Sequence, residues 1–370
     1  MRILYDGWSL VYEPQGTAAL HLLAMFSIEM PGIQRTAALP GKRPEWLPDE
    51  IESWVRETPD TALGRLKWEQ GALPAIAEEV KAGWLHMLSP AAPLSWARRC
   101  IISQASYQEA PWRRGSRGSR GRRSLWDRIR ESMAFGGVER ARIVLWPDDL
   151  PEPDGLGQET RLVKLPPLVH PAFTPGRGQE STLDRDDLPD AYVLYQGAGE
   201  PEDLYPLLDA WSWAAGSIGE GVPLVVLGDA TDARLKLDEE LVDPELMKSV
   251  LVLSRPTSEN PASSTAGIYK QAAAFFSAAE LLPWGDPMRS AMRCGLPVAA
   301  AETKWTGAAV GPAAYLAPQG DARALGAALL TLIVEEEAAE KMGEAAAARA
   351  EEWQTKAFGE RLLEVYREAG

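Results

Sequence analysis

The chain has 370 residues, of which 45% are hydrophobic, and a formal net charge of −15 at pH 7. This length exceeds what one hydrophobic core usually accommodates, so we expect two α/β domains of about 150 to 200 residues each. The acidic balance argues against a general nucleic-acid-binding protein, because phosphate contacts need a broad basic surface.

The first domain opens with a strand, a loop and a helix. Met1 to Tyr5 read as a short apolar strand, residues 6–16 as a loop that ends in Gly16, and residues 17–29 as an apolar helix. This order is common to every Rossmann-like domain, so by itself it indicates only the class of fold.

His86 lies at the end of the next predicted strand, after a helix that carries the letters W-E-Q-G-A-L-P at residues 68–74. Open α/β sheets place ligand-binding groups at the carboxyl ends of parallel strands. As a neutral imidazole, His86 could bind a hydroxyl group or act as a base. The alternative is a structural histidine in an apolar strand. Another strand, Cys100 to Ser103, leads directly to Gln104.

Six arginines then interrupt the acidic chain, separated by glycine and serine and flanked by Trp112 and Trp126. They are Arg113, Arg114, Arg117, Arg120, Arg122 and Arg123. A basic segment with aromatic flanks suits an anionic lipid surface, so we expect peripheral membrane contact as one use of this patch. A solvated loop is the simplest alternative, and an RNA contact is a further one that the overall acidity disfavours.

Ile143 to Pro147 read as a further strand of the first domain. A linker and a second domain follow. Residues 163–175 and the Pro-, Gly- and Asp-rich stretch to Pro189 read as the linker. Strands are predicted at Tyr192 to Gly197, Pro223 to Gly228 and Val250 to Leu253. Their alternation with helices predicts a parallel sheet. The last 50 residues read as a helical tail rich in Ala and Glu that Gly343 breaks.

Cys100 and Cys294 are the only cysteines, and neither has a second Cys or a His at a metal-ligand spacing. We therefore expect reduced, buried thiols and no metal site. The N-terminal segment lacks the basic region of a signal peptide. No run approaches the roughly 18 apolar residues of a membrane span. The sequence predicts a cytoplasmic protein, with the arginine patch allowing contact at the inner membrane face.

The order of motifs resembles that of a retaining family 4 glycosyltransferase. Residues 266–318 carry the family's A-M-x-x-G-x-P-V run as Ala291-Met292, Cys294-Gly295 and Pro297-Val298. Residues 68–74 resemble its W-E-Q-x-x-L-P helix, and residues 163–175 its V-x-P-N-G-V-D segment. The resemblance implies the GT-B architecture, with two Rossmann-like domains facing each other across a cleft. Residues 1–175 would form the first domain, 176–354 the second, and a last helix of about 355–370 would return to the first.

The resemblance also implies a site for a nucleotide-sugar donor, which would be a substrate and not a cofactor. Gly16 and Thr17 would face its diphosphate, since the first turn of a helix attracts phosphate. His86 and Gln104 would contact the sugar or acceptor, although an amide cannot exchange a proton near neutral pH. The other expected donor-binding residues are Gly197, Glu280, Trp284, Gly285 and Ser290.

Several charged groups that the family uses are absent from this chain. Leu282 and Ser290 stand in the places of its two glutamates, and Ala198 stands where it has an arginine that neutralises the diphosphate. Two hypotheses follow. The first is a retaining transferase that moves a hexose to a glycan or lipid-linked acceptor. The second is a non-catalytic subunit that binds a partner glycosyltransferase or a glycan. A nicotinamide dehydrogenase is disfavoured because no G-x-G-x-x-G follows any predicted strand.

Overall fold

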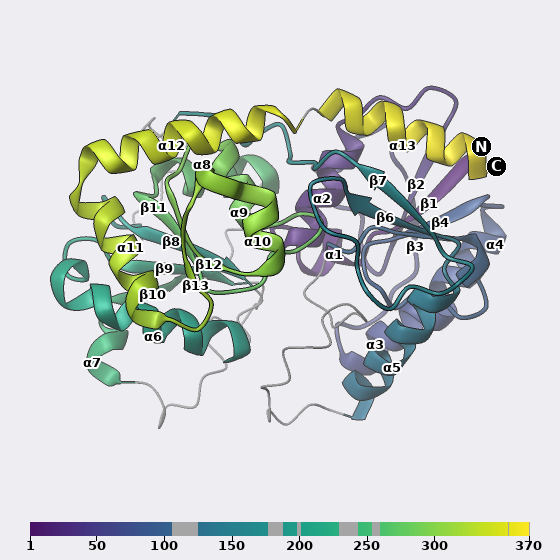
Figure 1. Cartoon of the computed structure of the whole chain (residues 1–370). Helices are drawn as coiled ribbons and strands as arrows, with labels where there is room; N and C mark the ends of the chain where they lie inside the picture. The colour runs from purple at the N-terminus through teal and green to yellow at the C-terminus, as the bar shows by residue number, and fades with distance from the viewer. Residues whose placement is uncertain are drawn as a thin grey trace. The chain divides into compact units, whose positions relative to one another are not determined.

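The computed structural model describes residues 1–105, 125–176, 188–197, 201–228, 243–253, 260–353 and 355–369 (Figure 1). The six arginines of the predicted basic patch lie outside these ranges. The chain divides into two compact units. Unit 1 comprises Met1–Leu168, Leu282–Gly285 and Gln354–Gly370, and unit 2 comprises Val169–Leu281 and Asp286–Trp353. The chain therefore enters unit 1 three times, once for only four residues.

Unit 1 contains a parallel sheet in the order β3-β2-β1-β4-β5-β6-β7. Its strands are β1 (Arg2–Asp6), β2 (Gln34–Leu39), β3 (Glu52–Val55), β4 (Trp84–Met87), β5 (Cys100–Ile102), β6 (Ile143–Pro147) and β7 (Arg161–Leu165). Its helices are α1 (Trp8–Tyr12), α2 (Thr17–Phe26), α3 (Ala62–Lys67), η1 (Trp68–Ala72), α4 (Leu73–Glu79), η2 (Ala97–Arg99), α5 (Leu125–Arg140) and α13 (Thr355–Ala369). Tyr5 on the central strand β1 lies opposite Ala37 on β2 and His86 on β4.

Unit 2 repeats this arrangement with the order β10-β9-β8-β11-β12-β13. Its strands are β8 (Val193–Gly197), β9 (Leu224–Gly228), β10 (Val250–Leu253), β11 (Ala274–Ser277), β12 (Val298–Glu302) and β13 (Tyr315–Pro318). Its helices are α6 (Pro201–Ile218), α7 (Pro244–Met247), α8 (Pro261–Gln271), α9 (Pro287–Arg293), α10 (Lys304–Val310), η4 (Gly311–Ala313), α11 (Ala322–Val334) and α12 (Glu336–Glu351).

Both faces of the unit 2 sheet are covered by helices, as the buried strand β11 shows. Phe276 belongs to the core formed with α6 and α11. The neighbouring Phe275 points to the other face, where its ring stacks on Tyr269 of α8 with the ring centroids 6.0 Å apart, a spacing typical of aromatic pairs. Successive side chains of a strand point to opposite faces, so a strand with apolar residues at consecutive positions is buried on both sides. Continuous apolar runs in the sequence, such as that of β11, therefore form strands in the interior of the sheet.

The strands expected at residues 143–147, 192–197, 223–228 and 250–253 are confirmed to within one residue. Two expectations are wrong. Residues 163–165 belong to β7, which pairs with β6 along its whole length, and are not part of a linker. Gly343 lies inside α12, and the tail is interrupted at Glu335 instead. A Cβ at Gly343 would lie 2.5 Å from the Gly295 carbonyl oxygen, so glycine here permits close packing and does not end the helix.

We predict that Gly343→Ala lowers the free energy of unfolding by about 1 to 3 kcal/mol, because the added methyl group forces α12 away from residue 295. Gly216→Ala in α6 is the matched control, since no atom lies within 4 Å of its added Cβ. That change should instead raise stability by about 0.5 to 1 kcal/mol. Chemical denaturation of both variants measures the difference, and equal effects would contradict the packing explanation.

Candidate functional site

Each sheet has one point at which the strand order reverses. In unit 1 it lies between β1 and β4, and in unit 2 between β8 and β11. In open parallel sheets, ligands bind outside the carboxyl ends of the strands at such a point. In unit 2, Gly197 is the last residue of β8, and Glu280 follows the end of β11 by three residues. In unit 1, Gln104 follows β5 by two residues and His86 lies near the end of β4.

Glu280 in unit 2 is held in place by buried hydroxyl groups. Thr303, directly after β12, donates from Oγ1 to the Glu280 Oε1 at 2.6 Å, and its Oγ1 also lies 2.7 Å from the Thr306 Oγ1. The Thr303 hydroxyl accepts from the backbone N–H of Thr306 and so caps α10. Both threonines are buried, whereas Glu280 is partly exposed. The result is an oriented carboxylate that can accept hydrogen bonds from sugar hydroxyls.

The other residues of unit 2 that were expected to bind a donor have local packing roles. A Cβ at Gly197 would lie 2.0 Å from the Tyr195 hydroxyl, so only glycine fits beside that ring. Ser290 is 9% exposed within α9. The start of α9 is already occupied by an acidic group, because the Asp286 carboxylate accepts from the backbone N–H of Met288 at 2.8 Å. A phosphate at this helix start would meet that carboxylate.

Trp284 and Gly285 belong to unit 1 and lie against α2, β6, α13 and the loop after β5. Trp284 is 1% exposed; its indole N–H donates to the Leu145 carbonyl at 3.0 Å, and its backbone N–H donates to the Gln104 carbonyl at 3.3 Å. Gly285 has φ +65°, and a Cβ there would lie 2.4 Å from the Thr17 carbonyl oxygen. Four predicted site residues, Thr17, Gln104, Trp284 and Gly285, therefore lie together.

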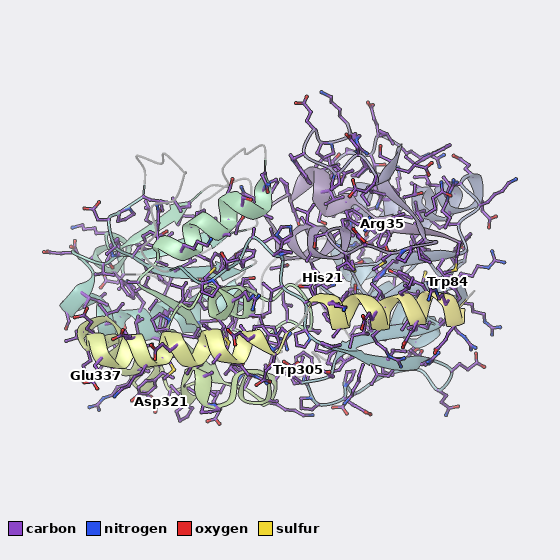
Figure 2. All side chains as sticks on the ribbon, turned by 90° about the horizontal axis from the view of Figure 1, so that it is seen from above. His21, Arg35, Trp84, Trp305, Asp321 and Glu337 are labelled. Carbon is purple, nitrogen blue, oxygen red and sulfur yellow. The ribbon has the colours of Figure 1, made fainter. Side chains whose placement is uncertain are left out.

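His21 is part of the same cluster and was not among the predicted site residues. It follows Thr17 by one helical turn on α2 and is labelled in Figure 2. Its ring stacks on Trp284 at 5.3 Å, and the ring of Phe358 near the start of α13 lies edge-on to it at 6.3 Å. The side chain is 1% exposed. Within the described residues, neither ring nitrogen has a hydrogen-bond partner. Burial lowers its pKa to about 3, with a smaller contribution from His86, so the ring is neutral at pH 7.

His86 lies in the interior of unit 1, where both of its ring nitrogens are engaged. The Nδ1 lies 2.6 Å from the Tyr366 hydroxyl on α13, and the Nε2 lies 2.8 Å from the Ser103 hydroxyl after β5. Tyr366 also pairs with the Tyr5 hydroxyl at 3.0 Å. His86 has no exposed surface, and burial lowers its pKa to about 3. In this position it ties the last helix to β1, β4 and β5, and neither nitrogen is presented to a substrate.

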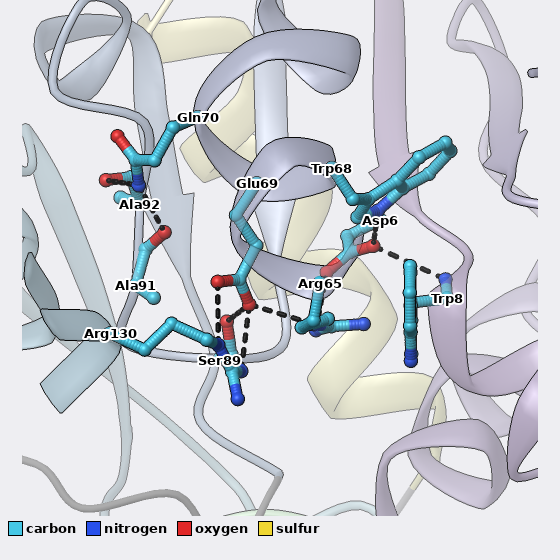
Figure 3. Close-up of polar contacts among 10 residues, drawn as sticks. All are labelled: Asp6, Trp8, Arg65, Trp68, Glu69, Gln70, Ser89, Ala91, Ala92 and Arg130. Carbon is cyan, nitrogen blue, oxygen red and sulfur yellow. Dashed lines mark hydrogen bonds and ion pairs between the residues drawn. The ribbon is translucent and has the colours of Figure 1, made fainter. Parts of the chain in front are cut away.

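A buried charge network at the unit 1 reversal point was missed by the sequence reasoning (Figure 3). Asp6, at the end of β1, accepts from the Trp68 indole at 2.8 Å and from Arg65 at 3.1 Å. Glu69 accepts from Arg65 at 2.8 Å and from two nitrogens of Arg130 at 2.8 and 2.9 Å. The two carboxylates are at most 1% exposed, and the two guanidinium groups are 14% and 19% exposed.

The π-helical turn η1 explains how consecutive residues join this network. Its wider turn directs both Trp68 and Glu69 inward, and π-helical turns are frequent at functional sites. Burial raises the pKa of Glu69, but Arg130 and Arg65 outweigh this and hold it below its usual value. The carboxylate therefore stays ionised and is a poor general base. The W-E-Q run at 68–70 was the signal in the sequence that could have located this cluster.

Cys100 and Cys294 are buried free thiols, and burial raises the pKa of both. The described residues include no group of three or more His, Cys, Asp or Glu side chains placed to hold a metal ion. No helix within the described ranges has the length and apolar composition needed to cross a membrane.

Comparison with known proteins establishes the fold. The sequence matches no protein-family model and no curated protein. Sucrose-phosphate synthase from Thermosynechococcus elongatus is similar over 100% of this chain and 98% of its own, with a TM-score of 0.69 and 15% identity. WaaG, a glycosyltransferase involved in lipopolysaccharide biosynthesis, has a TM-score of 0.71 and 12% identity over 99% of both chains. HepE from Anabaena, solved with UDP and glucose, has a TM-score of 0.67 and 15% identity over 99% of both.

The chain has the GT-B fold. The structural similarity extends over its whole length, and both of its sheets are parallel. The predicted fold class is thereby confirmed.

We predict that Glu69→Gln lowers the free energy of unfolding by about 3 to 5 kcal/mol, because two buried guanidinium groups lose their shared carboxylate. Glu79→Gln is the matched control in the same unit. Its ion pair with Arg56 is about 40% exposed on both sides and should contribute at most about 1 kcal/mol. Equal losses of unfolding free energy in Glu69→Gln and Glu79→Gln, measured by denaturant unfolding, would contradict the large contribution that we assign to the buried network.

We also predict that the protein loses stability in acid because of its buried histidines. The folded pKa values of His21 and His86 are both about 3, below the ordinary value of 6.5, so below pH 6.5 the unfolded chain takes up protons that the folded chain does not. Each histidine should then lower the free energy of unfolding by up to about 1.4 kcal/mol per pH unit between pH 6 and pH 4.

His21→Leu isolates one of these contributions, because other groups titrate identically in the variant. As the pH falls below 6, the free energy of unfolding of His21→Leu should rise relative to that of the wild type by up to about 1.4 kcal/mol per pH unit. Urea unfolding at pH 7, 6, 5 and 4 measures it. A difference that is constant with pH would mean that His21 is protonated or exposed in the folded protein.

Proposed function

We propose that the chain is a retaining glycosyltransferase that moves a hexose from a nucleotide-sugar donor to a glycan or lipid-linked acceptor. The full-length GT-B fold supports this, since HepE with the same fold was solved with UDP and glucose. The observation that carries the proposal is the Glu280 carboxylate, which Thr303 orients beyond the carboxyl ends of β11 and β12. An oriented carboxylate at the reversal point of a parallel sheet suits a sugar.

The protein would act chiefly by positioning the donor and by stabilising the departing diphosphate. In unit 2, Glu280 would accept hydrogen bonds from the donor sugar, and Gly197 would keep the end of β8 free of a side chain. In unit 1, Gly16 and Thr17 begin α2, a helix of ten residues whose N-cap has no side-chain hydrogen bond. The partial positive charge of such a helix end would favour a phosphate group.

We predict that Glu280→Gln lowers kcat/KM for the accepted donor by about 10- to 100-fold, because a charged hydrogen bond to the sugar is weakened. The measurement is transfer with a panel of UDP-, GDP- and ADP-sugars and mixed glycan acceptors, followed by NMR of the anomeric configuration. Glu337→Gln is the matched control, since that exposed side chain on α12 only pairs with Lys341. It should leave kcat/KM unchanged.

Three outcomes would revise the proposal. An inverted anomer would rule out the retaining mechanism while leaving the transferase. Donor binding without transfer to any acceptor would favour the non-catalytic subunit that binds a partner or a glycan. If no sugar nucleotide binds at millimolar concentration by calorimetry, the donor assignment fails.

A further inference from the structure

Trp284 is buried in unit 1, although the residues on either side of its four-residue segment belong to unit 2. The four-residue segment 282–285 enters unit 1 and places the indole between α2, α13 and the carbonyl of Leu145. Gly285 lies directly against the first turn of α2, where its bare Cα faces the Thr17 carbonyl and the Cβ of His21. With the segment in this position, Gly16, Thr17 and His21 are all buried.

The imidazole under Trp284 is an unfavourable choice for a purely structural position. Both of its nitrogens are buried without a hydrogen-bond partner among the described residues. A buried polar group that lacks a partner costs stability, and each such group in a native protein requires an explanation. Leucine or methionine would fill the same space on α2 without this cost. The presence of a histidine here is therefore explained best if a ligand hydrogen-bonds to its ring when the segment 282–285 adopts another arrangement.

The surroundings indicate the chemistry of that ligand. His21 and Thr17 are four residues apart and so share one face of α2, directly beyond the uncapped first turn. Backbone N–H groups at a helix start and an imidazole N–H are donors, and together they match the acceptor oxygens of a phosphate group. The Thr17 hydroxyl does not compete, because it donates to the Ala105 carbonyl at 2.6 Å.

We propose that Trp284 is a gate on a phosphate site formed by the first turn of α2 and His21. In the arrangement seen here the indole and Gly285 cover the site. When the segment 282–285 withdraws, His21 donates a hydrogen bond to the bound phosphate. The identity of the phosphate rests on the proposed function: it belongs to the diphosphate of a nucleotide sugar or to the phosphate of a lipid-linked acceptor.

Calorimetric titration of the full chain tests the gate with inorganic pyrophosphate, a UDP-sugar and a short-chain prenyl phosphate as separate probes. Because the apparent affinity is reduced by the fraction of open protein, Trp284→Ala should bind pyrophosphate about tenfold more tightly than the wild type. The double variant Trp284→Ala/His21→Leu should lose that gain. Trp54→Ala is the matched control, since this tryptophan on β3 of the same unit is 42% exposed, and it should change nothing.

The outcomes separate the gate from the proposed function. Tight pyrophosphate binding by Trp284→Ala without binding of any sugar nucleotide would keep the gate and overturn the donor assignment. Preference for the prenyl phosphate would assign the site to the acceptor. Equal or weaker pyrophosphate binding by Trp284→Ala, or a gain that survives His21→Leu, would overturn the gate. Trp284→Leu keeps an apolar side chain in place and repeats the test if the alanine variant does not fold.

Discussion

The parallel pairing of the strands is the constraint on which the rest of this molecule depends. Because the paired strands of each sheet run in one direction, their carboxyl ends lie at one edge, and the loops that follow them meet there. The reversal of strand order then separates two neighbouring loops and leaves room outside the strand ends. Asp6 and Gln104 in unit 1, and Gly197 and Glu280 in unit 2, all follow from this arrangement.

The charges at these edges are organised differently in the two units. In unit 1 the two guanidinium groups of Arg65 and Arg130 form ion pairs with two buried carboxylates, so their positive charge is neutralised within the unit. In unit 2 the Glu280 carboxylate is partly exposed and receives only a neutral hydroxyl from Thr303. At the first turn of α2, the donors offered to a phosphate would be backbone N–H groups and a neutral imidazole, which are weaker donors than arginine or lysine. Weak phosphate binding at this site is consistent with a gate, because a mostly closed site also lowers the apparent affinity.

The local sequence pattern predicted the positions of helices and strands well, but it predicted the contacts of individual side chains poorly. The strand Ile143–Pro147 was predicted to the residue, because a short apolar run between polar segments has one simple structural solution. Gly343 was misjudged, since a glycine inside a helix looks the same in a sequence whether it ends the helix or allows another backbone to approach. Glu69 was overlooked for a similar reason. A glutamate in a helical run resembles a solvated one until the π-helical turn directs it inward.

The sequence by itself determined the class of fold, the order of the elements and the residues that end the strands, because hydrophobic period and turn chemistry act over a few neighbouring positions. The tertiary structure alone decided which of these residues are available for chemistry. His86 is an interior residue because Tyr366, 280 positions away, occupies its Nδ1. His21 became a candidate because Trp284, far along the chain, stacks on it and because neither of its ring nitrogens has a partner among the described residues. Contacts of this kind depend on how distant segments pack, and no local pattern encodes them.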